Sequence, residues 1–484
     1  MSRPVPVEEA AVAAADAAAV VAASPRPDRA RWLDALAAAL EAHRDELVQL
    51  AAEETHLSTS RLDGEVTRTA AQLRFFAGVV LEGSYLEATI DTADATLTPP
   101  RPDLRRILRP LGPVGVFAAS NFPFAFSVLG NDTASALAAG CPVVVKAHPG
   151  HPLLSRRVAE LARGALSDAG APPGVFDLVE GVEDGVDLVR HPAIRAVGFT
   201  GSTAGGRALF DIACARPAPI PFYGELGSIN PVVVTEAAAR RRGPSIAAGF
   251  VGSFTRDGGQ YCTKPGLVFV PDSDAGDALL AAIEEQLLLA PSQLLLTEHM
   301  TAALDDHVAR GEFDRRSILR GCAAVGETEP VVVTVDLGRF LDRHDYFVHE
   351  CFGPFAVVVR YRDDRDLSVA LAQVEGSLTA TLHVEGSDDI AALVEQLSSR
   401  SGRVIFNSWP TGVAIAWGQH HGGPWPATTS SIHTSVGATA IRRFLTPIAY
   451  QDCPPALLPE ELTDESAVPR RIDGEMVSPS RLRA

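Results

Sequence analysis

The sequence predicts an α/β protein with a Rossmann-like parallel-sheet domain, a second α/β domain and a small β arm. With 484 residues the chain is too long for one ordinary domain, so two or three are expected. Short β-branched segments alternate with helix-like segments in two series, the first starting near residue 114 and the second near residue 231. Extended segments outside both series, at 85–109 and after 434, predict the arm.

The first 85 residues are expected to be helical. An Ala- and Val-rich run at 10–24 predicts a surface helix and not a signal peptide, because acidic residues precede and interrupt it. Asp28 is expected to cap a helix whose apolar residues keep helical spacing over 33–50. Another helix is expected at about 62–80.

Strands alternate with helices in the first series, which indicates a parallel sheet covered on both faces. Such sheets bind ligands at the carboxyl ends of their strands. The expected strands are 114–119, 143–147, 176–179, 193–200 and 219–226, with helices that include 125–139 and 153–166.

The second series predicts another α/β domain. Its expected strands are 231–235, 266–270, 331–335, 355–361, 378–383 and 403–407. The tail is expected to hold a helix at 438–444 and a strand at 446–450. The expected division is 1–87 with 111–227 as the first domain, 228–433 as the second, and 88–110 with 434–484 as the arm.

Composition excludes several classes of protein. The formal net charge of −18 argues against a nucleic acid partner. Arginine runs at 240–242 and 470–471 are local exceptions, expected to be solvated surface. No stretch is long and apolar enough to span a bilayer, so a cytoplasmic protein with no membrane partner is expected. The six cysteines are scattered singly and none is spaced for zinc, so reduced thiols and no metal site are expected.

A glycine-rich turn follows the strand expected at 193–200. Gly201 and Ser202 open this turn, which leads into helix formers, and such a turn lets backbone amides approach a phosphate. Alone, it fits a simple glycine-rich connection equally well, because it is not the usual Gly-x-Gly-x-x-Gly.

Five further motifs follow one another along the chain. They are Asn121-Phe122-Pro123, Lys146 at a strand end, Glu225-Leu226-Gly227-Ser228-Ile229-Asn230-Pro231, Gly259-Gln260-Tyr261-Cys262 and Glu350-Cys351-Phe352-Gly353-Pro354. In this order and spacing the chain resembles the aldehyde dehydrogenase superfamily over nearly its whole length. Within it, the alpha-ketoglutaric semialdehyde (2,5-dioxovalerate) dehydrogenase branch is the most similar, on segments 115–127, 142–152, 406–413, 421–427 and 435–445.

The resemblance implies that an aldehyde is oxidised to a carboxylic acid through a thioester on Cys262. A thiolate attacks the aldehyde carbon readily when its pKa is lowered. Asn121 and the Cys262 backbone N–H would stabilise the oxyanion, and Glu225 would activate the water that hydrolyses the thioester. Without the resemblance, Cys262 would be a buried apolar filler, Asn121 a helix cap and Glu225 a surface carboxylate.

The resemblance also implies how a nicotinamide cofactor is held. Lys146 would hydrogen-bond a ribose, Gly201 and Ser202 would contact the pyrophosphate, Glu350 would hold the nicotinamide ribose and Phe352 would lie against the ring. The first domain would then bind the cofactor, and the second would carry the nucleophile.

Pro149 departs from the pattern of many NAD-dependent members, which carry a glutamate three residues after the lysine. Loss of that carboxylate removes repulsion against a 2′-phosphate, so NADP is expected, with NAD as the alternative. Cationic side chains nearby support this expectation, namely His148, His151, Arg156 and Arg157.

Lys264 is the second departure, because the resemblance to this branch implies a neutral residue at that position. Three roles stay open: it binds a substrate carboxylate, it lowers the pKa of Cys262, or it points to solvent.

The expected substrate is a small aldehyde, 2,5-dioxopentanoate, with other aliphatic aldehydes or semialdehydes as alternatives. Exposed strand edges in the arm need cover, so a homodimer or homotetramer is expected. A CoA-acylating enzyme of the same fold is an alternative function. Glu225 is evidence against it, because such enzymes generally lack this base. A catalytically silent, structural member of the fold is another alternative.

Overall fold

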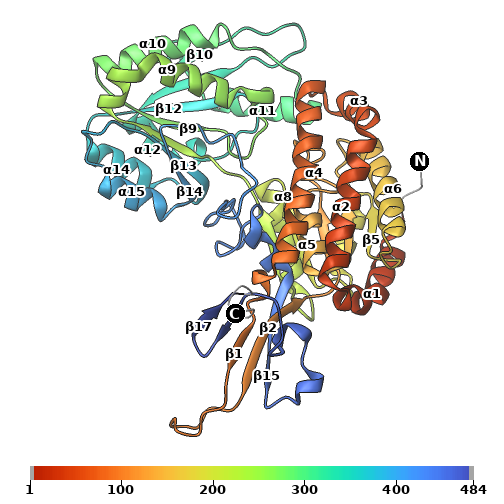
Figure 1. Ribbon diagram of the computed structural model, residues 1–484. Helices are drawn as coiled ribbons and strands as arrows, with labels where there is room; N and C mark the ends of the chain where they lie inside the picture. Colours follow the sequence, from red (N-terminus) through yellow and green to blue (C-terminus); the bar gives the residue numbers. More distant parts are fainter. Residues whose placement is uncertain (1–4, 479–484) are drawn as a thin grey trace.

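The computed structural model describes residues 5–478 and confirms the α/β architecture expected from the sequence. Two α/β domains lie beside each other, and a β arm extends away below the first of them (Figure 1). Among the helices of residues 5–478, none is long and apolar enough to cross a membrane.

The first domain is built on a parallel sheet in the order β5-β4-β3-β6-β7. Its strands are β3 (Val114–Phe117), β4 (Val143–Lys146), β5 (Phe176–Val179), β6 (Ala196–Thr200) and β7 (Phe222–Glu225). The order of the strands reverses between β3 and β6, and sheets of this kind bind ligands outside the carboxyl ends at that point. All five expected strands are confirmed.

Helices cover both faces of this sheet because successive apolar residues of each strand point to opposite sides. Val114 and Val116 pack into one hydrophobic cluster, and Phe117 packs into the other. The first face carries α2 (Arg26–Ala42), α4 (Thr59–Glu82), α5 (Asn131–Ala139) and α6 (Pro152–Asp168); the second carries α1 (Val7–Ala23), α7 (Val182–Arg190) and α8 (Thr203–Ala215).

Three helix boundaries differ from those expected. The helix expected over 28–50 is interrupted at His43, which leaves helical geometry (φ −112°, ψ 18°), and α3 (Arg44–Thr55) follows. Asp28 does not cap α2, which begins two residues earlier; it lies in the first turn, where its charge favours the positive end of the helix dipole. The helix expected from residue 125 begins only at Asn131, after hydrogen-bonded turns.

The second domain contains a seven-stranded sheet in the order β10-β11-β12-β9-β8-β13-β14. Its strands are β8 (Pro231–Val234), β9 (Leu267–Pro271), β10 (Ile318–Arg320), β11 (Val331–Asp336), β12 (Phe355–Tyr361), β13 (Ser377–His383) and β14 (Ser401–Phe406). All six expected strands are confirmed and run parallel, whereas β10 was not expected and runs antiparallel at the edge.

Helices enclose this sheet as well. One face is covered by two helices, α9 (Glu236–Phe254) and α10 (Asp274–Leu287). The other face is covered by α11 (Glu298–Arg310), α12 (Leu337–Asp342), α13 (His344–Phe347), α14 (Asp364–Ala372) and α15 (Ala391–Ser398). Burial on both faces explains why the central strands are nearly continuous runs of apolar residues.

The arm is a sheet in the order β15-β2-β1-β16-β17. It joins β1 (Thr89–Asp91) and β2 (Leu104–Pro110) to β15 (Leu445–Gln451), β16 (Arg470–Ile472) and β17 (Glu475–Val477). The strand pair expected at 85–109 and the strand at 446–450 are confirmed. The helix expected at 438–444 is confirmed as a 3₁₀ helix, Ala438–Phe444.

The arginine runs are only partly solvated, contrary to expectation. Arg470 is 2% exposed and donates to the carbonyls of Thr463 and Asp464, which holds the C-terminal segment against the arm. Arg242 is half-buried and donates to the Glu385 carboxylate.

Candidate active site

Four of the expected positions lie together at the carboxyl edge of the first sheet. Asn121 follows β3, Lys146 ends β4, Ser202 follows β6 next to Gly201, and Glu225 ends β7. Parallel strands present their carboxyl ends at one edge, so these side chains converge as the sequence pattern predicts.

The second sheet meets this edge with the amino ends of its strands. Cys262 lies in the loop before β9 and Glu350 in the loop before β12. A Cβ at Gly227 would lie 2.6 Å from Glu350 Oε2, so this carboxylate lies against the segment that follows Glu225. Phe352 is half-buried in the same loop.

The loop that carries Cys262 depends on a glycine and an asparagine. Gly259 has φ +67°, and a Cβ there would lie 2.4 Å from the carbonyl oxygen of Gly353, so no larger residue fits. Asn230 Nδ2 donates to the carbonyls of Cys262 (2.7 Å) and Lys264 (2.9 Å). The buried Asn230 therefore fixes the backbone on both sides of the thiol, a role that the motif around it did not reveal.

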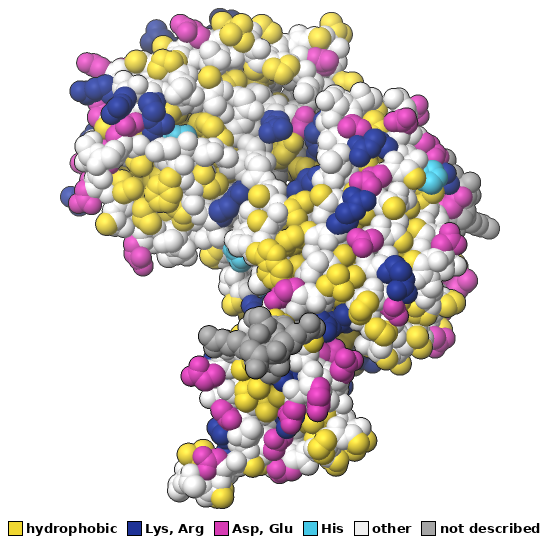
Figure 2. Space-filling model, in the orientation of Figure 1, with side chains coloured by type: hydrophobic (Ala, Val, Ile, Leu, Met, Phe, Trp, Pro, Cys, Tyr) yellow, Lys and Arg dark blue, Asp and Glu magenta, His cyan; other side chains and the backbone are white. Residues whose placement is uncertain are grey.

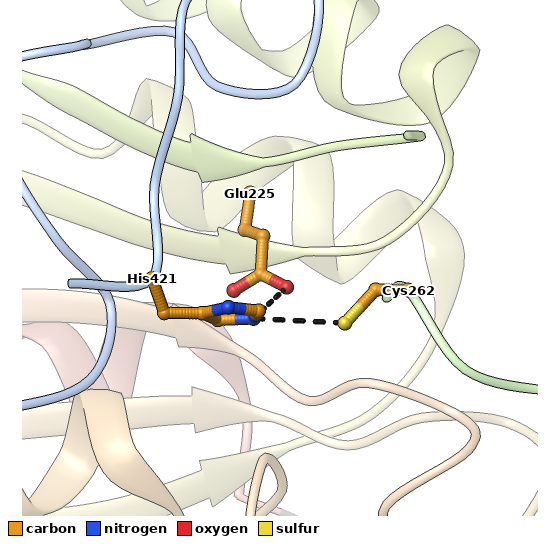
Figure 3. Close-up of side chains that lie close together, drawn as sticks. All are labelled: Glu225, Cys262 and His421. Atoms are coloured by element: carbon orange, nitrogen blue, oxygen red, sulfur yellow. Dashed lines mark hydrogen bonds and ion pairs between the residues drawn. The ribbon is translucent and has the colours of Figure 1, made fainter. Parts of the chain in front are cut away.

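Glu225, Cys262 and His421 point toward one another from three separate segments (Figure 3). His421 Nε2 lies 2.8 Å from Glu225 Oε1 and 3.6 Å from Cys262 Sγ. Ser435 Oγ donates to the other carboxylate oxygen at 2.6 Å. Because an ionised carboxylate only accepts hydrogen bonds, Nε2 carries the proton in its bond to Glu225.

The pKa values of Glu225 and Cys262 are shifted in opposite directions. Burial raises the pKa of Glu225, but the charge and hydrogen bond of His421 and the hydrogen bond of Ser435 outweigh it, so the pKa is lowered. Burial, followed by the Glu225 and Glu350 carboxylates, raises the pKa of the Cys262 thiol well above its usual range. The resting pair is therefore a carboxylate beside a thiol, and sulfur needs a base before it can attack.

His421 is a site residue that sequence reasoning missed. The segment 421–427 was used only as one of the stretches that resemble the dehydrogenase branch. His421 also lies 159 residues from Cys262 along the chain, so their contact cannot be seen in the sequence. One feature of the sequence could have pointed to His421: it is a histidine that precedes two glycines, in the segment after the last strand of the second sheet.

Asn121 reaches the nucleophile's loop. Its Nδ2 donates to the carbonyl of Gln260 at 2.8 Å, two residues before Cys262. The alternative role as a helix cap is wrong, since the next helix is preceded by Gly130. An amide nitrogen carries two protons, so a second N–H is available to an oxyanion.

The start of α8 is an exposed, glycine-rich helix terminus. Ser202 is exposed and caps the helix by accepting from the Gly205 N–H at 3.2 Å. A Cβ at Gly206 would lie 2.2 Å from Leu226, so glycine lets the helix pack closely against the end of β7. Exposed amides at a helix start attract phosphate, and half-buried Lys146 at the end of β4 adds a cation. Burial lowers the pKa of this lysine.

The histidines and arginines near Pro149 do not supply the free positive charges that were expected to bind a 2′-phosphate. Both arginines are ion-paired at 2.7 Å, Arg156 with Glu180 and Arg157 with Glu46. Burial lowers the pKa of His148 to about 3 and also lowers that of His151, so both rings are neutral at physiological pH. That part of the expectation is wrong, and only the missing carboxylate at Pro149 favours a 2′-phosphate.

Lys264 does not point to solvent. It is 3% exposed, and Nζ donates to the carbonyls of Cys351 (2.8 Å) and Phe355 (2.6 Å). These bonds tie the Cys262 loop to the loop that carries Glu350, which makes Lys264 a structural cross-link between them.

The three side chains of Figure 3 also have the chemistry of a metal site. Their sulfur, nitrogen and oxygen atoms all lie within 4.8 Å of one another, and zinc takes this donor set. Cysteine spacing alone does not reveal such a group, because its members come from distant parts of the chain.

Comparison with known proteins agrees with this geometry. The model of the aldehyde dehydrogenase family matches residues 2–446. Alpha-ketoglutaric semialdehyde dehydrogenase 2 of Azospirillum brasilense is 46% identical, over 97% of this chain and 91% of its own length. Alpha-ketoglutaric semialdehyde dehydrogenase of Acinetobacter baylyi is 40% identical, over 95% and 88% respectively.

Among solved structures, a putative aldehyde dehydrogenase from Burkholderia cenocepacia has the same fold, with a TM-score of 0.77 and 23% identity over 92% of both chains. The family match spans both α/β domains, and the two relatives cover nearly the whole chain. The protein therefore belongs to the aldehyde dehydrogenase family.

Proposed function

We propose that this aldehyde dehydrogenase oxidises 2,5-dioxopentanoate, the alpha-ketoglutaric semialdehyde, to the dicarboxylate with NADP. The observation that carries the chemistry is the convergence of Cys262, His421 and Glu225 at the meeting edges of the two sheets. The substrate is inferred from the names of the two relatives at 46% and 40% identity.

The residues around Cys262 supply each step of the reaction. The Cys262 thiol loses its proton to solvent while the His421 N–H stabilises the thiolate, and the sulfur adds to the aldehyde carbon. The second N–H of Asn121 and the Cys262 backbone N–H hold the resulting oxyanion. A nicotinamide held by Glu350 and Phe352 would supply the hydride acceptor, and loss of hydride from the adduct would leave a thioester on Cys262. Glu225 then takes a proton from water, whose oxygen attacks the thioester and releases the acid and the sulfur.

The cofactor is assigned to the carboxyl edge of the first sheet. Gly201 and Ser202 at the start of α8 would receive the pyrophosphate, and Lys146 a ribose hydroxyl. Glu350 would hold the nicotinamide ribose, with Phe352 beside the ring. NADP is preferred over NAD on the missing carboxylate at Pro149 alone.

The parts of the chain divide these tasks. Residues 1–87 and 111–227 bind the cofactor, 228–433 carry the nucleophile, and 88–110 with 434–484 join subunits into a homodimer or homotetramer. The cytoplasmic location expected from the sequence stays a prediction.

The test is a panel of aldehydes, each assayed with NADP and with NAD. We expect the highest kcat/KM for 2,5-dioxopentanoate with NADP. A value about tenfold higher with NAD, equivalent to about 1.4 kcal/mol, would overturn the cofactor assignment. Turnover that requires CoA would favour the acylating rival, and NADP binding without oxidation of any aldehyde would favour a silent member of the fold.

A further inference from the structure

Two arginines of α4 lie beside the active-site loop, and they differ in their partners. Arg61 is neutralised by ion pairs with Glu65 and Asp257, and it also donates to the carbonyl of Asn121. Arg68 is half-buried and donates to the carbonyl of Val413 at 3.1 Å, and it has no carboxylate partner within residues 5–478. A guanidinium has five N–H donors, so most of those on Arg68 are left for another acceptor.

Aromatic contacts connect Arg68 to the nucleophile. Its guanidinium lies over the Phe126 ring, 5.8 Å from the centroid. The Phe126 ring is 6.2 Å from that of His421, whose Nε2 lies 3.6 Å from Cys262 Sγ. On the other side, Phe122 packs edge-on against Phe126 at 5.4 Å. An apolar wall therefore runs from the sulfur to a cation.

The charge of Arg68 is not compensated where it lies. Burial lowers the pKa of Arg68, and Glu65 and then Arg61 act on it in opposite directions. A thiolate on Cys262 would raise the pKa of Arg68, and it would also raise that of Arg403 on β14. A partly buried cation with no counterion is costly, and a ligand anion removes that cost.

We propose that Arg68 binds the carboxylate of an aldehyde substrate that carries its aldehyde and its acid at opposite ends. This rests on the proposed function and specifies how the semialdehyde is recognised: the carbonyl carbon at Cys262, the chain along Phe126, and the acid at the guanidinium. Arg68 takes the role that the sequence left open for Lys264, whose amine is occupied by carbonyls.

A purely structural role for Arg68 makes a different prediction. Arg403 donates to the carbonyls of Pro410 and Gly412, so both arginines hold the loop 410–413. If Arg68 did no more than this, replacing it would impair every substrate equally.

The experiment compares Arg68→Gln and Arg68→Lys with 5-oxopentanoate and pentanal, which share a five-carbon aldehyde but differ in the carboxylate. Glutamine keeps an N–H donor for Val413 and removes the charge. We expect KM for 5-oxopentanoate to rise about 10–100-fold in Arg68→Gln, the scale of a hydrogen bond to a charged group. Its kcat, and both constants for pentanal, should stay within about twofold, and lysine should restore part of the binding.

Arg216→Met is the control variant. Like Arg68, Arg216 is half-buried and has no ion pair in the described chain, and it donates to two backbone carbonyls. It lies at the far end of α8, away from Cys262. This variant should leave the preference for 5-oxopentanoate unchanged. Equal losses for both aldehydes in Arg68→Gln, or an unchanged preference, would overturn the role of Arg68. A wild-type enzyme with no preference for 5-oxopentanoate over pentanal would instead overturn the proposed substrate class.

Discussion

His421 Nε2 faces both a sulfur and a carboxylate, and a single nitrogen cannot serve both at once. While Nε2 donates to Glu225, that carboxylate is held ionised, and the thiol keeps its proton. When Nε2 donates to the sulfur instead, that hydrogen bond stabilises the thiolate, and the Cys262 proton can leave to solvent. The ring thus links the group that must lose a proton first with the group that must take one later.

Replacing the two reacting side chains separates the half-reactions. Cys262→Ala should abolish oxidation, since no covalent adduct can form. Glu225→Gln should keep a pre-steady-state burst of NAD(P)H while steady turnover falls about 10²–10⁴-fold, the usual effect of losing a general base. Rapid-mixing absorbance at 340 nm (about the nicotinamide maximum) measures both. Unchanged steady turnover in Glu225→Gln would show that another group activates the water.

Glu225 should also control the reactivity of the resting thiol. Its negative charge helps to raise the pKa of Cys262, so Glu225→Gln should lower that pKa and make alkylation by iodoacetamide faster at a given pH. In the wild type, alkylation should quicken as pH rises into the raised thiol range. Ser435→Ala, which removes a hydrogen bond but no charge, is the control. Slower alkylation in Glu225→Gln would mean that the carboxylate deprotonates the sulfur.

The sequence predicted the position of those site residues that lie at the end of a strand. Lys146 and Glu225 end parallel strands, so one rule of sheet geometry puts them at the same edge. His421 and Arg68 follow no such rule, because one lies in an irregular segment and the other on a helix face. The neutral state of His148 depends on burial, which neighbouring residues in the sequence do not encode.

At the scale of elements, the loop before β9 is a closely packed piece of backbone with a glycine at positive φ. Gly259→Ala should destabilise the fold by at least about 1 kcal/mol and reduce activity, because alanine resists positive φ and its Cβ would meet the Gly353 carbonyl. Thermal unfolding and kcat measure the two effects. Gly164→Ala is the control, since that residue lies exposed within α6 with nothing near its Cβ, and alanine there should stabilise by up to about 1 kcal/mol. An equally stable, fully active Gly259→Ala would contradict this account of the loop.

Strands were easier to predict than helix limits. Strands such as β4 and β11 are short β-branched runs that are largely buried, and this composition is itself the signal. Helix ends depend on single turns, as at His43, where one residue leaves helical geometry while the apolar spacing continues. The short β10 is only half-buried and carries no such signal.

At the scale of the molecule, the arm packs by its base against the first domain, extends beyond it, and shows acidic, basic and apolar side chains on the face in view (Figure 2). Strands β15 and β17 are its two edges, and each has a strand partner on one side only. Unpaired edges recruit another chain, so we expect a dimer or tetramer by light scattering and sedimentation. A monodisperse monomer across micromolar concentrations would contradict this role of the arm.

The pairing of Thr89 with Arg471 in this arm has a consequence for biosynthesis. The ribosome makes β1 and β2 early, but their partners β15 and β16 emerge only after the whole second domain has been translated. Throughout that interval the early hairpin lacks both neighbours, and nascent chains with open edges tend to associate wrongly. Rapid completion of the chain, or a chaperone that shields this hairpin, would therefore decide how much of the newly made polypeptide reaches its folded form.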